Sequence, residues 1–64
     1  IQIDVYDVAG KLVNTLQDGF IQAGFHEFKW NGQDQLGLRS ASGLYFITVK
    51  SKNSIKTIKS MLLQ

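Results

Sequence analysis

Apolar residues recur at every second position in several short segments of this chain, and no segment keeps helical periodicity for longer than about two turns. In the first segment, Ile1, Ile3 and Val5 alternate with polar residues. Successive side chains of a β-strand point to opposite faces of its sheet, so this pattern is typical of a strand with one buried face. The alternation restricts the chain to folds built from strands.

Five such segments predict five strands, at residues 1–5, 12–16, 25–30, 44–50 and 55–63. The fourth segment is rich in β-branched and aromatic residues and is apolar on both parities, which predicts a central strand. Lys56 and Lys59 suit the last segment to a solvated edge. Short strands separated by turn residues predict an all-β sandwich rather than an α/β fold.

Turn-forming residues fill the gaps between these segments. Asp7 is expected to accept hydrogen bonds from nearby backbone N–H groups, and Gly10 to adopt a positive φ, which together predict a tight hairpin. Residues 31–42 are rich in Gly, Asn, Gln and Ser, so they are expected to form a long loop. We expect Leu36 or Leu38 to anchor that loop to the core.

The composition is that of one small soluble domain. The 64 residues contain no cysteine, and 44% of them are hydrophobic and 19% charged, which indicates neither a disordered tail nor a membrane span. Seven Lys and Arg against five Asp and Glu give a net charge of +2, but only one of the seven is Arg, so nucleic acid is not an expected partner. Because the chain starts inside a strand pattern without Met, we interpret residues 1–64 as a single domain excised from a larger protein.

The reactive side chains do not form a recognisable catalytic or metal-binding set. His26 is the only histidine, so there is no His cluster for a metal. The chain has no cysteine, so there is no Cys–His pair for nucleophilic catalysis. The alternation places Asp4 and Glu27 on outward faces, which argues against a paired acid and base. Asn31 and Asp34 lack the spacing of an EF-hand loop. The chain is therefore expected to be no enzyme, with no catalytic residues, no metal site and no cofactor.

The aromatic residues have two interpretations. Phe28, Trp30, Tyr45 and Phe46 could form a platform for stacking sugars, or they could fill the core. Because a domain of this size has little apolar surface to bury, we favour core packing and expect Phe28 and Trp30 to point inward.

Three motifs occur in a recognisable order. Tyr6-Asp7-x-x-Gly10 forms a turn, residues 24–32 combine Gly-Phe-His with a closing Trp-Asn-Gly, and residues 42–46 read Ser-Gly-Leu-Tyr-Phe. Together with residues 59–64, these motifs are spread over nearly the whole chain. The sequence resembles the type A C-terminal sorting domain of the type IX (Por) secretion system, which is related to the immunoglobulin-like domain of the flagellar hook-capping protein. The proline-containing first strand of that family is missing.

The resemblance implies an immunoglobulin-like antiparallel β-sandwich lacking the family's first strand. It implies a non-catalytic secretion signal that directs an upstream cargo domain through the periplasm and across the outer membrane, to the cell surface or the medium. The expected partner is the type IX secretion machinery, which would dock on the last strand and its neighbour. The expected recognition residues are Gly43, Tyr45, Lys59, Met61, Leu62 and Leu63.

Alternatives remain open beside this interpretation. The chain could be a structural or accessory sandwich, similar to a flagellar cap domain or a carbohydrate-binding module of a larger extracellular protein. Lys50, Lys52, Lys56 and Lys59 could meet an anionic partner, or they could simply keep an edge strand soluble. A sheet without its first strand also presents unpaired backbone, which predicts coverage by the parent chain or by a second copy in a homo-oligomer.

Overall fold

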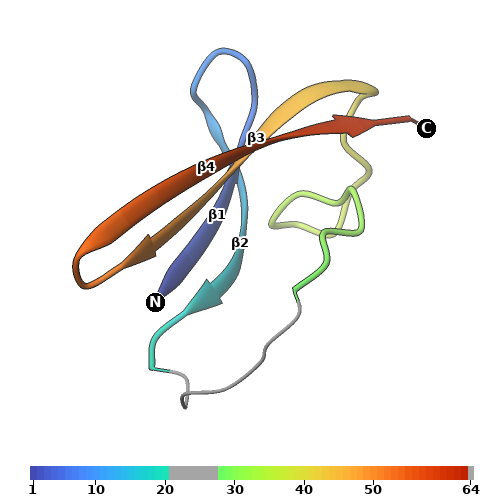
Figure 1. The fold of residues 1–64 in the computed structure, drawn as a ribbon. Helices are drawn as coiled ribbons and strands as arrows, with labels where there is room; N and C mark the ends of the chain where they lie inside the picture. Colours follow the sequence, from blue (N-terminus) through green and yellow to red (C-terminus); the bar gives the residue numbers. More distant parts are fainter. Residues whose placement is uncertain (21–27, 64) are drawn as a thin grey trace.

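The computed structural model describes residues 1–20 and 28–63, and these residues form one four-stranded antiparallel sheet (Figure 1). The strands are β1 (Gln2–Tyr6), β2 (Leu12–Asp18), β3 (Gly43–Ser51) and β4 (Ser54–Leu62). Their order across the sheet is β2-β1-β3-β4. A connection that includes a long loop therefore carries the chain from one edge strand, β2, across to the far side of β1.

The described residues confirm the all-β prediction and are consistent with part of an immunoglobulin-like sandwich. Four of the five expected strands are present, β3 lies inside the sheet, and β4 is an edge strand, as their sequences predict. The predicted strand at residues 25–30 is not found in the described residues. Residues 25–27 lie outside the described residues, and residues 28–30 are not in a strand, so the prediction is wrong for the part that can be assessed.

The turn between β1 and β2 forms as its sequence predicts. Asp7 Oδ1 accepts hydrogen bonds from the backbone N–H groups of Ala9 (3.0 Å) and Lys11 (2.9 Å). Gly10 adopts a φ of 84°, which a residue with a Cβ atom rarely adopts. The Asp7 carboxylate thus accepts hydrogen bonds from two N–H groups of the turn, and it stabilises the hairpin between β1 and β2.

The core lies on one face of the sheet around β1. Ile3 and Val5 are buried there, and they pair with Val49 and Ile47 of β3. Tyr45, two residues before Ile47, is buried on the same face. Burial of such side chains contributes roughly 25 cal/mol for each Å² of apolar surface removed from water, so this face supplies much of the stabilisation.

Asp4 contradicts the expectation that it faces outward into water, because it is only 1% exposed. It lies on the opposite face from Ile3 and Val5, between two threonines of the neighbouring strands, Thr15 and Thr48. Thr15 Oγ1 donates a hydrogen bond to Asp4 Oδ1 (2.8 Å), and Gln2 Nε2 donates one to Asp4 Oδ2 (2.9 Å). A carboxylate on an inner strand can be buried when both oxygens accept hydrogen bonds.

The loop before β3 is anchored by polar groups, not by leucines. Leu36 and Leu38 are both exposed, so the prediction that one of them anchors the loop is wrong. Instead, the carbonyl oxygen of Gln33 accepts hydrogen bonds from Asn14 Nδ2 (2.8 Å) and Trp30 Nε1 (2.9 Å). The Gln35 N–H donates to the Val13 carbonyl (3.1 Å), so the loop covers part of the free edge of β2.

Asn14 is therefore expected to contribute to stability through this loop. Replacing it with alanine removes the donor to Gln33 and also the acceptor of the Thr15 N–H (2.8 Å). We expect Asn14→Ala to lower the free energy of unfolding by about 1 to 2 kcal/mol, since each net hydrogen bond contributes on the order of 1 kcal/mol. Urea denaturation measures this change, and an unchanged midpoint would show that the loop is held by other contacts.

Phe28 and Trp30 do not share one environment. Phe28 is exposed, so the expectation that it points into the core is wrong. Trp30 is half-buried, and its ring meets that of Tyr45 edge to face, with ring centroids 4.8 Å apart. The indole also donates its N–H to the loop, so Trp30 joins the core face to the loop instead of lying in a strand.

Candidate interaction surface

The six residues that the sequence indicates for recognition gather at one end of the β3–β4 hairpin. Pairing between the two strands places Gly43 opposite Leu62, Leu44 opposite Met61, Tyr45 opposite Ser60 and Phe46 opposite Lys59. Leu63 follows directly after β4. The structure therefore brings together the start of β3 and the end of β4, whose paired residues lie 13 to 19 positions apart in sequence, through an antiparallel ladder.

These six residues differ in accessibility. Lys59, Met61 and Leu63 are exposed, whereas Gly43 and Leu62 are half-buried and Tyr45 is 7% exposed. A partner that docks from solvent can contact Lys59, Met61 and Leu63 directly. Lys59 and Met61 are two positions apart on one strand, so they share a face of the sheet.

Tyr45 supports the hairpin from within. Its hydroxyl donates a hydrogen bond to the carbonyl oxygen of Ala41 (2.6 Å), and its ring packs against Trp30. The residue therefore joins β3, the loop that precedes β3 and the core face. We expect it to act on recognition through the folded shape of the hairpin.

Gly43 sits where the loop enters β3. Its φ of 151° lies in the region that glycine favours, and no heavy atom beyond Gly43 and its two chain neighbours lies within 4 Å of the position that a Cβ atom would take. Backbone conformation, not close approach of a neighbouring group, is therefore the constraint at this position.

The hairpin is basic along its length. Lys50, Lys52, Lys56 and Lys59 are exposed, and residues 40–64 contain no Asp or Glu. The five acidic residues all lie before residue 35. Because no carboxylate of the hairpin itself offsets these ammonium groups, the surface around β4 carries a net positive charge.

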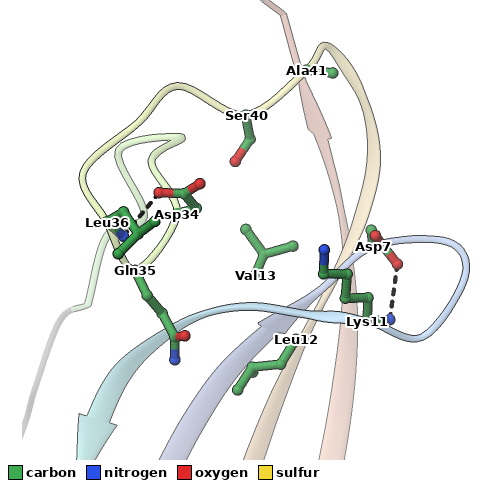
Figure 2. A pocket seen from close by; sticks show the side chains of 9 residues that line it. All are labelled: Asp7, Lys11, Leu12, Val13, Asp34, Gln35, Leu36, Ser40 and Ala41. Atoms are coloured by element: carbon green, nitrogen blue, oxygen red, sulfur yellow. Dashed lines mark hydrogen bonds between the residues drawn. The ribbon is translucent and has the colours of Figure 1, made fainter.

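A separate pocket lies between the β1–β2 turn and the loop before β3, with a volume of about 300 Å³. Figure 2 shows Asp7 and Lys11 on the turn side, Asp34 and Leu36 on the loop side, and Val13 between them. Asp34 Oδ1 accepts hydrogen bonds from the N–H groups of Leu36 (2.9 Å) and Leu38 (3.0 Å).

Both carboxylates of this pocket hold their own turns. Asp7 fixes the β1–β2 turn and Asp34 fixes the loop, so their hydrogen bonds account for the local backbone. Within residues 1–20 and 28–63, no group of three or more His, Asp or Glu side chains is placed to hold a metal ion. The two carboxylates therefore have a structural role, since each stabilises the backbone conformation of its own turn. His26 and Glu27 lie outside the described residues.

Two polar groupings are not apparent from the pattern of the sequence. The carboxylate of Asp4 joins Gln2 and Thr15, and the carbonyl oxygen of Gln33 gathers Asn14 and Trp30. A signal for the second grouping is Asn14 itself, because an amide side chain interrupts the otherwise apolar start of β2.

In the part of the chain that the structure describes, no helix is long and apolar enough to cross a membrane.

The four-stranded antiparallel sheet of residues 1–20 and 28–63 is all-β and is consistent with part of an immunoglobulin-like sandwich. The chain belongs to the FlgD Ig-like domain family, whose model matches residues 1–54. This membership confirms the expected relationship to the flagellar immunoglobulin-like domain. The narrower resemblance to type IX sorting domains stays a prediction.

Two curated relatives are similar to the chain. They are the basal-body rod modification proteins FlgD of Salmonella typhimurium (strain LT2) and Salmonella typhi, each 35% identical over 49 residues. The match covers 77% of this chain and 21% of each relative, so the chain spans about a fifth of their length. No solved structure gives a significant match.

Proposed function

We propose that this chain is a non-catalytic assembly module of a larger secreted or surface protein, and that it helps to hold that protein in an extracellular structure. Membership of the FlgD Ig-like family supports this proposal, because the relatives are named for modification of the basal-body rod. The proposal concerns the module alone, since the relatives are much longer.

The observation that carries the proposal is the character of β4. This nine-residue edge strand exposes large apolar side chains, and it begins at residue 54, where the match to the family model ends. Within the described residues its outer backbone edge has no strand partner. An exposed edge of this kind supplies directional hydrogen bonds to an incoming strand, while its side chains give selectivity.

The proposal predicts that the module governs where the parent protein is found and not what the parent does. Deleting residues 1–64 from the parent, expressed in its own host, is expected to abolish incorporation into the surface or extracellular fraction. The parent's own biochemical activity, assayed after purification, should persist. Immunoblotting of fractionated cells measures the first quantity, and unchanged incorporation would refute the assembly role.

A second candidate function is the type IX sorting signal. What supports it is that Lys59, Met61 and Leu63, which the resemblance indicates for recognition, are all exposed at one end of the hairpin. In this proposal the type IX machinery docks on the end of β4, and the upstream cargo is exported through the periplasm.

Fusion to a reporter discriminates the two candidates. A reporter that ends in this domain, preceded by the first strand that the resemblance implies, is expected to be exported by a bacterium with a type IX system. Removing residues 59–64 should leave it in the periplasm. A reporter that remains in the periplasm with the intact domain would leave only the assembly role, and export that survives the truncation would exclude the end of β4 as the recognised segment.

A further inference from the structure

The outer side of β4 is the longest open edge among the described residues. β3 occupies one side of all nine residues of β4, and β4 ends the strand order. In an antiparallel ladder, backbone groups alternate between the two sides of a strand, so half of those of β4 are directed away from β3. The edge at β2 is different, because the Gln35 N–H already bonds the Val13 carbonyl there.

The side chains of β4 expose apolar surface on both faces of the sheet. Ile58 pairs with Ile47 on the core face and is nevertheless 54% exposed. Ile55 and Met61 lie on the other face and are 66% and 63% exposed. A partner that extended the sheet beyond β4 would cover all three side chains together.

The sequence of β4 has approximate mirror symmetry about Ile58. Ile55 and Met61 lie three residues to either side, and Lys56 and Ser60 lie two residues away. Thr57 and Lys59 are its immediate neighbours. When two identical strands pair antiparallel about a two-fold axis perpendicular to the sheet, residues equidistant from the axis lie opposite each other.

With the axis at Ile58, the two strands match chemically. Ile58 meets Ile58 of the second copy, and Ile55 meets Met61 of the second copy on both sides of the axis. Each lysine meets a hydroxyl side chain, Lys56 against Ser60 and Lys59 against Thr57. Apolar cross-strand pairs stabilise a sheet, whereas like charges directly opposite destabilise it.

The neighbouring registers are less favourable. An axis at Lys56 or Lys59 places that lysine against its own copy. An axis at Thr57 places Lys56 against Ile58 and Lys59 against Ile55. An axis at Ser60 places Lys59 against Met61. Only the register centred on Ile58 pairs all three exposed apolar residues with apolar residues and places no lysine directly opposite a lysine or an apolar residue.

From this pattern we infer that β4 pairs with β4 of a second copy, antiparallel and centred on Ile58, so that two sheets join into one of eight strands. The contact is isologous, so it closes after two copies. The loop that occupies part of the β2 edge disfavours head-to-tail growth through that edge. The dimer explains why an edge strand at the surface carries two isoleucines and a methionine instead of polar side chains alone.

An interface of two strand edges is smaller than the roughly 1,200 to 2,000 Å² of a stable protein complex. The dimer therefore dissociates readily on dilution, and it is expected to be populated at high protein concentration or when a larger parent structure holds two copies close together. This inference goes beyond the proposed function, because assembly into an extracellular structure does not require two copies of the module to touch.

A single introduced cysteine tests the register directly, because the chain has no cysteine of its own. Ile58→Cys places two thiols opposite each other at the axis, and incubation with oxidised glutathione is expected to give a covalent dimer on a non-reducing gel. Ser54→Cys is the matched control on the same strand. Its thiols would lie about 27 Å apart, at roughly 3.4 Å per residue over eight residues, and should not cross-link.

A charge at residue 57 tests the same register without covalent chemistry. Thr57→Glu sets a carboxylate against Lys59 of the second copy on both sides of the axis, and it should tighten dimerisation about 3- to 10-fold at low salt. Thr57→Lys sets like charges there and should weaken it by a similar factor. In the register centred on residue 57 the glutamates would face each other, so Thr57→Glu would weaken the dimer.

Sedimentation equilibrium of the 64-residue chain and of both charged variants measures these shifts, with circular dichroism as the check that each variant is folded. Stronger association of the Thr57→Glu variant, lost at high salt, supports the dimer, as does cross-linking of the Ile58→Cys variant alone. A monomer at every concentration, equal cross-linking by the Ser54→Cys variant, or weaker association of the Thr57→Glu variant would overturn it.

Discussion

Replacing Tyr45 with alanine is expected to lower the free energy of unfolding by about 3 to 5 kcal/mol. The substitution removes a buried ring from the core face, its edge-to-face contact with Trp30 and the hydrogen bond to the Ala41 carbonyl. Loss of a buried aromatic side chain costs about 3 to 5 kcal/mol. A 64-residue domain has roughly 3 to 10 kcal/mol of stability in total, so the loss removes a large fraction of it.

The conservative variant Tyr45→Phe separates the ring from the hydroxyl. It keeps the contact with Trp30 and removes only the donor to Ala41, so it should lower the free energy of unfolding by about 1 kcal/mol. Thermal melts followed by far-ultraviolet circular dichroism compare the two variants. Equal destabilisation by alanine and phenylalanine would show that the hydrogen bond, and not the packing of the ring, holds the loop and β3 together.

Replacing Asp4 with alanine is expected to have the second-largest effect, a loss of about 3 kcal/mol. The carboxylate is buried on β1 and accepts hydrogen bonds from Thr15 and Gln2. Hydrogen bonds to charged groups contribute about 1.5 to 3 kcal/mol each, and a buried donor left without an acceptor adds a desolvation cost. Because Asp4 pairs with both Thr15 and Thr48, alanine also leaves a gap between two strands.

Two further variants test the cause of this loss. Asp4→Asn keeps the shape and one acceptor oxygen, so its destabilisation should be smaller than that of alanine. Thr15→Val removes one of the two donors, and in combination with Asp4→Ala it should cost less than the sum of the two single changes. Additive losses in urea denaturation would show that Asp4 and Thr15 do not stabilise each other across the β1–β2 pair.

Local chemistry explains why the turns and most strands could be predicted. Asp7 and Gly10 form a turn whose acceptor and positive φ are supplied within five residues, so no distant contact is needed. The β3 sequence, apolar on both parities, fits an inner strand, and the lysines of β4 fit an edge.

The errors arise where distant residues decide the outcome. Asp4 alternates with Ile3 and Val5 as a surface residue would, but the strands on both sides of β1 cover it and supply Thr15 as its donor. Trp30 continues an alternating pattern, yet its partners are Tyr45 and the Gln33 carbonyl. The periodicity of a segment predicts which face of the sheet a residue occupies, but it does not predict which distant side chains will contact that residue.

The candidate surface also contains some features that local sequence predicts and others that depend on distant residues. That Lys59 and Met61 belong to an exposed edge strand could be predicted from their own segment. Tyr45 and Gly43 could not be assigned to supporting positions without the fold, because the burial of Tyr45 depends on Trp30 and on the loop. Gly43 and Leu62 become neighbours only because β3 and β4 pair in the hairpin.

Amide hydrogen exchange of the 64-residue chain tests at once whether the sheet is folded and whether its β4 edge is free to accept a strand. At low protein concentration the amides of β1 and β3 should exchange most slowly, and about half of those of β4 should exchange fast, because they are directed away from β3. Raising the concentration should slow exchange in β4 while β2 stays unchanged. Uniformly fast exchange in β1, or full protection of β4 at every concentration, would contradict the account.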